Sequence, residues 1–230
     1  MLPDPLPNKV LERISVLPLK PSLVTLQGRH VYLQPLDIVR DGTPLFHISN
    51  GKPITTENST YPSYDSDERI WAYMNSGPFA TLGDFIAYLQ QGVNAADLLP
   101  FCVFDAKTKQ PIGSASFMAN MPQHLKIELG GIWYTPIAQG TVANTEATYL
   151  MLEHVFNLGY RRVEWKCNAL NCRSRRAAAR IGFTFEGIQE AHYIIKGRNR
   201  DTAWFRILDH EWEVIKKQLQ ATLYPIDLNK

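Results

Sequence analysis

Residues 171–183 read NCRSRRAAARIGF, and this stretch predicts a short basic helix that leads into an apolar strand. Asn171 can cap the helix and Gly182 can end it. About thirty residues earlier, 139–147 reads QGTVANTEA and opens a longer helix. Two helix N-termini that point at one place favour phosphate, because they present unpaired N–H groups and the positive ends of helix dipoles. The two stretches therefore predict a site for a phosphate-bearing cofactor.

The bulk composition is that of an ordinary globular protein. The chain has 230 residues, of which 45% are hydrophobic and 20% are charged, and its formal net charge is +2. This length suits one large domain with a sizeable core. So mild a charge disfavours nucleic acid as a partner. We expect an N-terminal arm at 1–28, a single domain at 29–220 and a C-terminal tail at 221–230.

Cysteine use and the first residues indicate a cytoplasmic protein. Cys102, Cys167 and Cys172 show no CxxC spacing, which argues against a disulfide framework and against a zinc site. The chain starts without a basic region followed by an apolar run, so no signal peptide is predicted. No apolar run approaches the ~20 residues that span a bilayer, so no membrane partner is expected.

Hydrophobic periodicity predicts strands and helices around one core. Gly130 and Gly131 interrupt the alternation of one strand and predict a bulge or a close backbone approach. Residues 41–64 are dense in Gly, Pro, Ser, Thr and Asn and predict a long loop. The order of elements favours an α/β or α+β fold, with a mixed, mostly antiparallel central sheet flanked by helices. The expected strands are 30–35, 101–104, 111–118, 124–134, 162–166, 183–196 and 201–208, and the expected helices are 65–75, 81–92, one that begins near Gln139, 173–181 and one capped by Asp209.

Six short motifs in order carry a resemblance to a known family. They are IELG at 127–130, QGTVANTEA at 139–147, LGYRRV at 158–163, NCRS at 171–174, GF at 182–183 and EG at 186–187. Over most of 25–212 the chain resembles the GNAT superfamily of acyl-CoA-dependent N-acyltransferases. It looks closest to the branch that includes the ribosomal-protein N-terminal acetyltransferases. The resemblance implies that the strand ending near Tyr134 and the strand ending near Asn168 splay apart.

The resemblance also implies that acetyl-CoA, the acyl donor, lies in the wedge between these two strands. Backbone groups of Ile132, Trp133 and Tyr134 would bond the pantetheine like an added strand. Asn171 would bond the pantetheine arm, and Ser174 would lie beside the thioester sulfur.

The phosphates of the donor would lie at the two helix starts. The basic helix offers guanidinium groups, which suit phosphate, although a solvated helix face is the alternative for these residues. The candidates are Arg173, Arg175, Arg176 and Arg180. The pyrophosphate would be held by the backbone amides of Gln139, Gly140, Thr141, Val142, Ala143, Asn144 and Thr145.

The chain departs from the family pattern at two places. The family loop reads Gln/Arg-x-x-Gly-x-Gly/Ala, and here its fourth and sixth positions are Val142 and Asn144. Valine disfavours positive φ and its side chain is expected to crowd the phosphate. The tyrosine that many members use as general acid, seven residues after the asparagine, is Ala178 here.

Transfer of an acyl group to an amine needs a base for the ammonium proton, a polarised carbonyl and an acid for the thiolate. Glu128, beside the expected wedge, is one candidate base, with an ion pair to Lys126 or to an arginine as the alternative reading. His192 is the other candidate base, because histidine titrates near neutral pH, and a packed or surface histidine is the alternative. Ser174 would assist the thiolate or cap its helix, or do both.

We therefore expect an N-acetyltransferase that moves an acetyl group from acetyl-CoA to a primary amine by direct transfer in a ternary complex. The acceptor would be a small-molecule or peptide amine, and a homodimer is an open alternative to a monomer. The charged residues 196–201 predict a solvated hairpin turn, with a border of the acceptor site or a dimer contact as alternatives. Two other functions stay open. One is a degenerate family member that binds acyl-CoA without acetylating, and the other is a binding module that uses the basic helix on RNA or an acidic protein.

Overall fold

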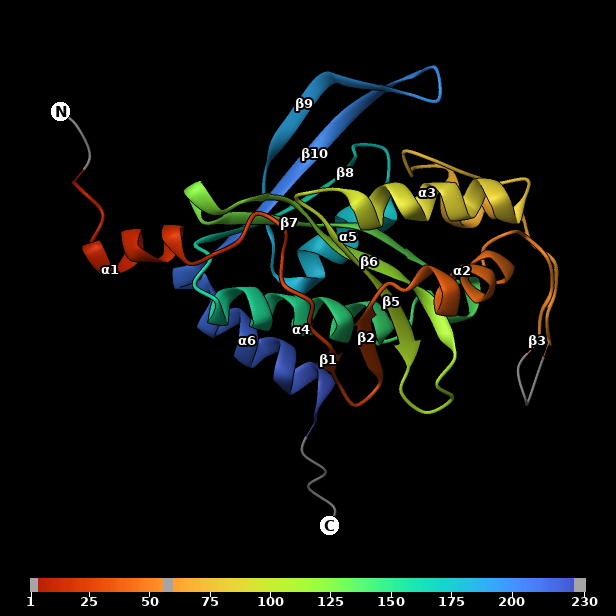
Figure 1. Cartoon of the computed structure of the whole chain (residues 1–230), viewed down its shortest axis with the longest axis horizontal. Coiled ribbons are helices and arrows are strands. Elements are labelled where there is room, and N and C mark those ends of the chain that lie inside the picture. The colour runs from red at the N-terminus through yellow and green to blue at the C-terminus, as the bar shows by residue number, and fades with distance from the viewer. Residues whose placement is uncertain (1–3, 56–59, 226–230) are drawn as a thin grey trace, which may run out of the picture.

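The computed structural model describes residues 4–55 and 60–225 and contains an eight-stranded sheet with helices on both faces (Figure 1). Neighbouring strands of this sheet are antiparallel except for β7 and β8, which are parallel. This is the mixed, mostly antiparallel sheet that the sequence predicts. In spatial order its strands are β1 (Leu26–Gln27), β2 (Val31–Pro35), β5 (Leu99–Asp105), β6 (Pro111–Met121), β7 (Lys126–Tyr134), β8 (Arg162–Asn168), β10 (Arg198–Leu208) and β9 (Thr184–Ile195).

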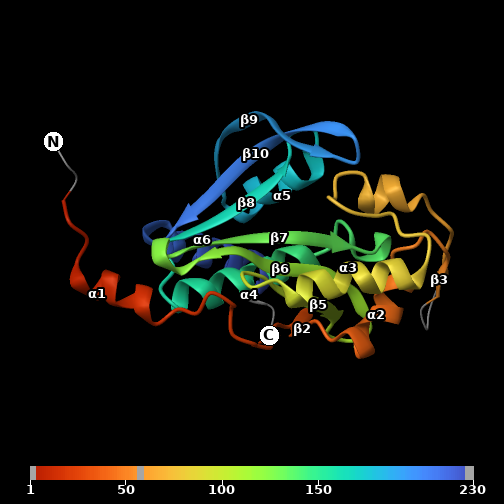
Figure 2. The same cartoon turned by 45° about the horizontal axis from the view of Figure 1, so that its top comes forward.

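The helices build two cores on opposite faces of the sheet (Figures 1 and 2). On one face, Met151 and Trp212 pack with Val163 of β8. On the other face, Leu45 and Phe85 belong to a second, aromatic-rich core. The helices are α1 (Asn8–Leu11), α2 (Ile38–His47), α3 (Leu82–Asn94), α4 (Ala143–Asn157), α5 (Cys172–Ile181) and α6 (Asp209–Leu223), with the shorter helical segments η1 (Glu12–Ser15), η2 (Asp67–Trp71), η3 (Pro122–His124) and η4 (Pro136–Ala138), and the small hairpin of β3 (Ile54–Thr55) and β4 (Thr60–Tyr61).

The two parallel strands at the centre separate after three residue pairs. Glu128 is the last residue of β7 with a partner in β8, namely Glu164, although the strands continue to Tyr134 and Asn168. Two residues of β7 lie opposite one of β6 near Gly131, whose φ is +61°. The glycine pair therefore forms the predicted bulge, and the predicted splay of the central strands is confirmed.

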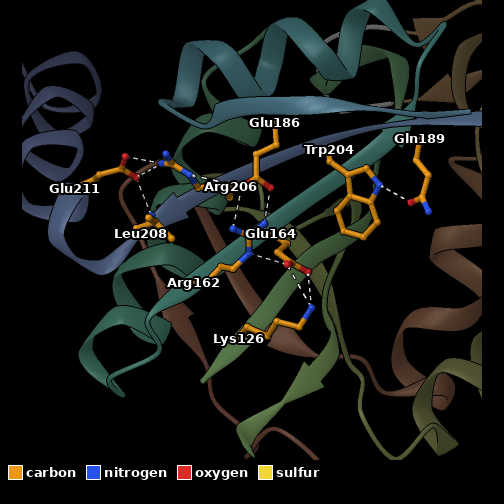
Figure 3. Close-up of polar contacts among 9 residues, drawn as sticks. All are labelled: Lys126, Arg162, Glu164, Glu186, Gln189, Trp204, Arg206, Leu208 and Glu211. Carbon is orange, nitrogen blue, oxygen red and sulfur yellow. Dashed lines mark hydrogen bonds and ion pairs between the residues drawn. The ribbon is translucent and has the colours of Figure 1, made fainter. Parts of the chain in front are cut away.

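Charged side chains tie the strands together before the point of separation (Figure 3). Arg162 of β8 bridges Glu164 and Glu186, and Lys126 lies 3.3 Å from Glu164. The carboxylate of Glu164 is thus already shared by two cations, which leaves Glu128 as the acidic side chain nearest the opening. The charged residues joined by these ion pairs are Lys126, Arg162, Glu164, Glu186, Arg206 and Glu211.

The prediction of a long loop at 41–64 is wrong at its start. Residues up to His47 belong to α2, where the Asp37 side chain caps the helix by accepting from the Arg40 amide at 2.9 Å. Gly42, which suggested a loop, instead permits close packing, since a Cβ there would lie 2.3 Å from Ile86 Cδ1 of α3. A tertiary contact between two helices therefore overrides the loop-like composition.

Other boundaries also move. The helix expected at 65–75 is only η2, and β10 begins at Arg198, inside the expected turn. The last helix is preceded by Leu208 rather than capped by the Asp209 side chain, because Glu211 accepts from the Leu208 amide at 2.8 Å. These shifts stay within a few residues, as is usual for element ends.

Two segments expected outside the domain, the N-terminal arm and the C-terminal tail, partly belong to it. Lys20 donates to the carbonyls of Val93 and Ala95 at 2.7 and 2.6 Å, and the last residues of the expected arm form β1 of the main sheet. The expected tail at 221–230 begins inside α6, and its residues 226–230 lie outside the described residues. In the described part of the chain, no helix is both long and apolar enough to cross a membrane.

Candidate active site

A cavity of about 840 Å³ opens where β7 and β8 separate. The loop before α4 follows the end of β7, and α5 follows the end of β8. Because the two strands are parallel, both helix N-termini come to the same edge of the sheet. Segments around η2 and β10 complete the wall. The charged residues that line it are Arg69, Glu128, Lys166, Arg173, Arg176, Arg180 and Arg200.

Asn171 and Ser174 both line the cavity and both hold α5 in place. The Ser174 amide donates to Asn171 Oδ1 at 3.0 Å, which caps the helix as predicted. The indole N–H of Trp165 donates to Ser174 Oγ at 3.0 Å and fixes the position of that oxygen. Structural roles are thus present for both residues, and the cavity leaves room for the predicted contacts with the donor.

The loop before α4 presents backbone N–H groups at the edge of the cavity. Two of the seven predicted amides already have acceptors: Gln139 donates to Pro136 O at 3.3 Å, and Ala143 donates to Thr141 Oγ1 at 3.2 Å. These two amides are therefore not available to phosphate. Five have no acceptor among the described residues, namely those of Gly140, Thr141, Val142, Asn144 and Thr145.

The expectation of strain at Val142 is wrong. Its φ is −69° and its ψ is −13°, in the ordinary helical region, and its half-exposed side chain does not line the cavity. The positive φ of the loop belongs to Gly140, at +75°. Asn144, the other departure from the family pattern, lines the cavity, and its buried Oδ1 has no hydrogen-bond partner among the described residues.

The free stretch of β7 forms one side of the opening. Ile132, Trp133 and Tyr134 have no partner in β8, so their β8-facing edge borders the cavity. The Tyr134 carbonyl is already engaged, however, because the Gln139 side chain donates to it at 2.9 Å and also to the Arg69 carbonyl at 2.9 Å. Gln139 therefore acts through its carboxamide, tying the loop to β7 and η2.

The arginines of α5 divide into two groups. Three of the four line the cavity, namely Arg173, Arg176 and Arg180. Arg175 instead donates to the Ala169 carbonyl at 3.2 Å and lies over the Phe185 ring. Arg175 is therefore held by the protein away from the cavity rather than solvated. The other three remain candidates for phosphate, although Arg173 also donates to the Glu68 carbonyl at 2.8 Å.

Glu128 is the carboxylate at the point of strand separation. Its side chain is buried, and Oε2 lies 2.8 Å from Nζ of Lys166 on β8. Burial raises the pKa of Glu128 above the usual carboxyl value, whereas the Lys166 ammonium lowers it. The alternative reading of Glu128 predicted an ion pair with Lys126 or an arginine. The ion pair is present, but its partner is Lys166, and Lys126 pairs with Glu164 instead.

His192 does not line the cavity. It is half-buried on β9, against the rings of Tyr193 and Trp204 at centroid distances of 3.8 and 5.9 Å. Partial burial and the charges of Lys166 and Arg200 lower the pKa of His192, so the neutral imidazole predominates near pH 7. Its predicted catalytic role therefore stays a prediction.

Lys166 and Arg69 are the charged lining residues that the sequence analysis did not single out, and it placed Arg200 in a solvated turn with a border of the acceptor site as an alternative. Lys166 lies two residues after Glu164, so both side chains lie on the same face of β8. Because Glu164 pairs with Glu128, this spacing could have placed Lys166 beside Glu128. Arg200 was expected in a solvated turn, but it is buried and lines the cavity. No signal in the sequence marks that burial, because it results from contact with the segment after η2.

Comparison with known proteins agrees with this geometry. Residues 52–184 match the acetyltransferase (GNAT) domain. A GCN5-related N-acetyltransferase from Brucella melitensis is 39% identical, with a TM-score of 0.80 over 90% of this chain and 88% of that one. A probable acetyltransferase of the GNAT family from Chromobacterium violaceum is 34% identical, with a TM-score of 0.74 over 84% of this chain and 90% of that one.

The fold extends to more distant proteins. An acetyl transferase from Salmonella typhimurium, described as modifying the N-terminal serine of a 50S ribosomal subunit protein, is 16% identical, with a TM-score of 0.66 over 80% of this chain and 99% of that one. At this identity the likeness shows the fold alone. No curated protein matches the chain significantly. Neither a non-acetylating acyl-CoA binder nor a basic-helix binding module gains support from these matches.

Proposed function

This chain belongs to the GNAT acetyltransferase family and is an N-acetyltransferase, and we propose that it transfers the acetyl group of acetyl-CoA directly to a primary amine in a ternary complex. The observation that carries the proposal is the cavity at the separation of β7 and β8, with two helix N-termini and a buried carboxylate around it. Three unpaired cysteines agree with a cytoplasmic location, which is part of the proposal, and a homodimer stays a prediction.

The residues present fit a phosphate-bearing donor. The first turn of α4 and its loop hold five amides that have no acceptor among the described residues. Arg173, Arg176 and Arg180 add positive charge to the same cavity. Unpaired N–H groups and guanidinium groups are the donors that pyrophosphate needs. We assign the phosphates to the α4 loop and α5, and the pantetheine to the edge of Ile132 and Trp133.

Acetyl-CoA supplies a thioester carbonyl that an amine can attack. Glu128 is the base in our proposal, since its carboxylate lies at the opening and can accept the proton of the ammonium. The Lys166 ammonium, 2.8 Å away, opposes the rise in the pKa of Glu128 that burial causes and so favours the ionised form that a base needs. Ser174, whose oxygen is fixed by Trp165, would hydrogen-bond the departing sulfur. Overall, an N–C bond forms and the C–S bond breaks. One proton of the ammonium passes to Glu128 before attack, and the second proton lost from nitrogen passes to the departing thiolate, which leaves as the free thiol of CoA.

His192 is the second candidate base. Because it does not line the cavity, a proton would have to reach it through water. Its neutral imidazole satisfies the electrostatic requirement for a base, but its position makes Glu128 the better assignment.

The proposal is tested first by ligand binding and then by turnover. Thermal unfolding is followed with acetyl-CoA, CoA and succinyl-CoA, because a ligand at 100 times its Kd stabilises the folded form by roughly 2.7 kcal/mol. We expect a rise in Tm with acetyl-CoA, and then release of free CoA thiol with an amine panel of amino acids, peptides, polyamines and amino sugars. Absence of any Tm shift with all three ligands would reject the donor site.

A further inference from the structure

We propose that the acceptor carries a carboxylate as well as its amine, and that the buried guanidinium of Arg200 binds this carboxylate while Glu128 receives the ammonium group. This inference rests on the proposed function and adds the chemical class of its second substrate.

Arg200 is a buried cation without a carboxylate partner. It is only 9% exposed, and none of the ion pairs among the described residues includes it. Its Nε is buried and has no acceptor in the described part of the chain. Because a buried, unpaired guanidinium is costly, an arginine kept in this state is explained by an anionic ligand.

Contacts between the β9–β10 hairpin and the η2 region hold Arg200 in a fixed position. Arg200 Nη1 donates to Asn75 Oδ1, and the guanidinium lies over the Tyr193 ring, 5.6 Å from its centroid. Nearby, Lys196 Nζ donates to the Trp71 carbonyl at 2.8 Å and lies 3.6 Å from Asp67. Arg200 lines the cavity and has no carboxylate partner among the described residues, so an anionic group of a ligand in the cavity can pair with its guanidinium.

Arg200 belongs to the acceptor side of the cavity rather than to the phosphate side. It lies close enough to Glu128 for its charge to lower the pKa of that carboxyl group. The phosphate-binding candidates come instead from the α4 loop and from α5, which pack on the opposite face of the sheet through Ala147 and Ala178. Glu128 and Arg200 therefore offer one acidic and one basic group to the same substrate.

The charges of the cavity favour an amino-carboxylate over a polyamine. Apart from the three α5 arginines assigned to the phosphates, the charged residues that line it are the cations Arg69, Lys166 and Arg200 and the carboxylate of Glu128, so a second or third ammonium group would meet repulsion without a partner. A carboxylate matches the planar fork of arginine and binds it through charge-assisted hydrogen bonds. A free amino acid and a peptide with an acidic first residue share this chemistry, and the assay below separates them.

The test compares matched amines with and without the carboxylate. Each L-amino acid is assayed beside its decarboxylated amine and beside its amide, and peptides that begin with Asp or Glu are assayed beside those that begin with Asn or Gln. We expect the carboxylate-bearing members to have kcat/KM values about 10- to 100-fold higher, as a hydrogen-bonded charge implies. Preference among the amino acids identifies a free amino acid, and preference among the peptides identifies an acidic peptide.

Arg200→Gln should abolish this preference, and Arg200→Lys should restore part of it, because lysine keeps the charge but loses the fork. Arg198→Gln, at an exposed position of the same hairpin, should leave the preference unchanged. The Tm shift with acetyl-CoA should be the same in all of these proteins. Loss of that shift in Arg200→Gln alone would mean that Arg200 serves the donor, which would overturn the assignment.

Other results separate failure of this inference from failure of the proposed function. If acetyl transfer occurs but decarboxylated amines are equal or better substrates, or if Arg200→Gln keeps the preference, the inference is wrong and the function stands. If acetyl-CoA binds but no panel member reacts, Tm shifts with CoA plus N-acetyl amino acids are compared with those for the N-acetyl amines. Equal shifts overturn the inference, and larger, Arg200-dependent shifts with the carboxylates support it.

Discussion

Glu128, at the last paired position of the two central parallel strands, has its Oε2 2.8 Å from Nζ of Lys166, which lies two residues beyond that position on β8. The pair therefore stands at the apex of the opening, where the strands begin to diverge. Burial favours the neutral carboxyl group and the ammonium opposes that effect. A base for an ammonium proton needs this balance, because it must be ionised before reaction and protonated afterwards.

Replacement of this base should affect turnover rather than donor binding. Glu128→Gln should lower kcat by about 10²- to 10⁴-fold, the usual contribution of a general base, with little change in the Kd of acetyl-CoA. Glu213→Gln, at an exposed position of α6, is the matched control. Calorimetric titration and steady-state kinetics give the two quantities. Full activity of Glu128→Gln would move the role of base to another group, with His192→Ala as the next variant to assay.

Removal of the cation should change the pH dependence of the reaction. Lys166 lowers the pKa of Glu128, so Lys166→Met should raise that pKa. Because the base acts when deprotonated, kcat/KM rises with pH through the pKa of Glu128, and the acidic limb of the profile should move to higher pH in the variant. The profile is measured over roughly pH 5 to 9. A limb at the same pH in both proteins would show that it does not report Glu128.

The loop before α4 allows a test of the departure at Val142. Since Val142 already has a helical φ of −69°, Val142→Gly should change the Kd of acetyl-CoA by less than about threefold, a few tenths of a kcal/mol. Gly140→Ala should weaken binding by about fivefold or more, because alanine at φ +75° costs about 1 kcal/mol. The reverse order of effects would mean that the loop adopts another conformation when the donor binds.

The contact between the β9–β10 hairpin and η2 should affect binding of the acceptor amine. Lys196→Ala removes the hydrogen bond to the Trp71 carbonyl and the ion pair with Asp67. We expect a higher KM for the amine, an unchanged Kd for acetyl-CoA and faster hydrogen exchange at 67–71, since the segment loses an anchor. Lys217→Ala, at an exposed position of α6, is the control. An unchanged exchange rate at 67–71 would show that the contact does not hold the segment.

Much of the fold could be predicted because its signals are local. Asn171 caps α5 and Gly182 ends it with φ +109°, and the bulge lies at the glycine pair of β7. The helix α2 could not be recognised, because Gly42 suggests a loop until its contact with Ile86 is known. Composition predicts the local preference of a segment, whereas the close packing of α2 depends on a residue of another helix, which local sequence does not reveal.

The sequence by itself determined the family, most of the order of strands and helices, and the presence of Glu128, Asn171 and Ser174 at the edge of one cavity. Periodicity, caps and glycines act over a few residues, so they can be read along the chain. Only the tertiary structure decided that Lys166 is the partner of Glu128 and that Arg200 is buried. Burial and charge pairing depend on which strands meet, and the residues that meet are far apart in the sequence.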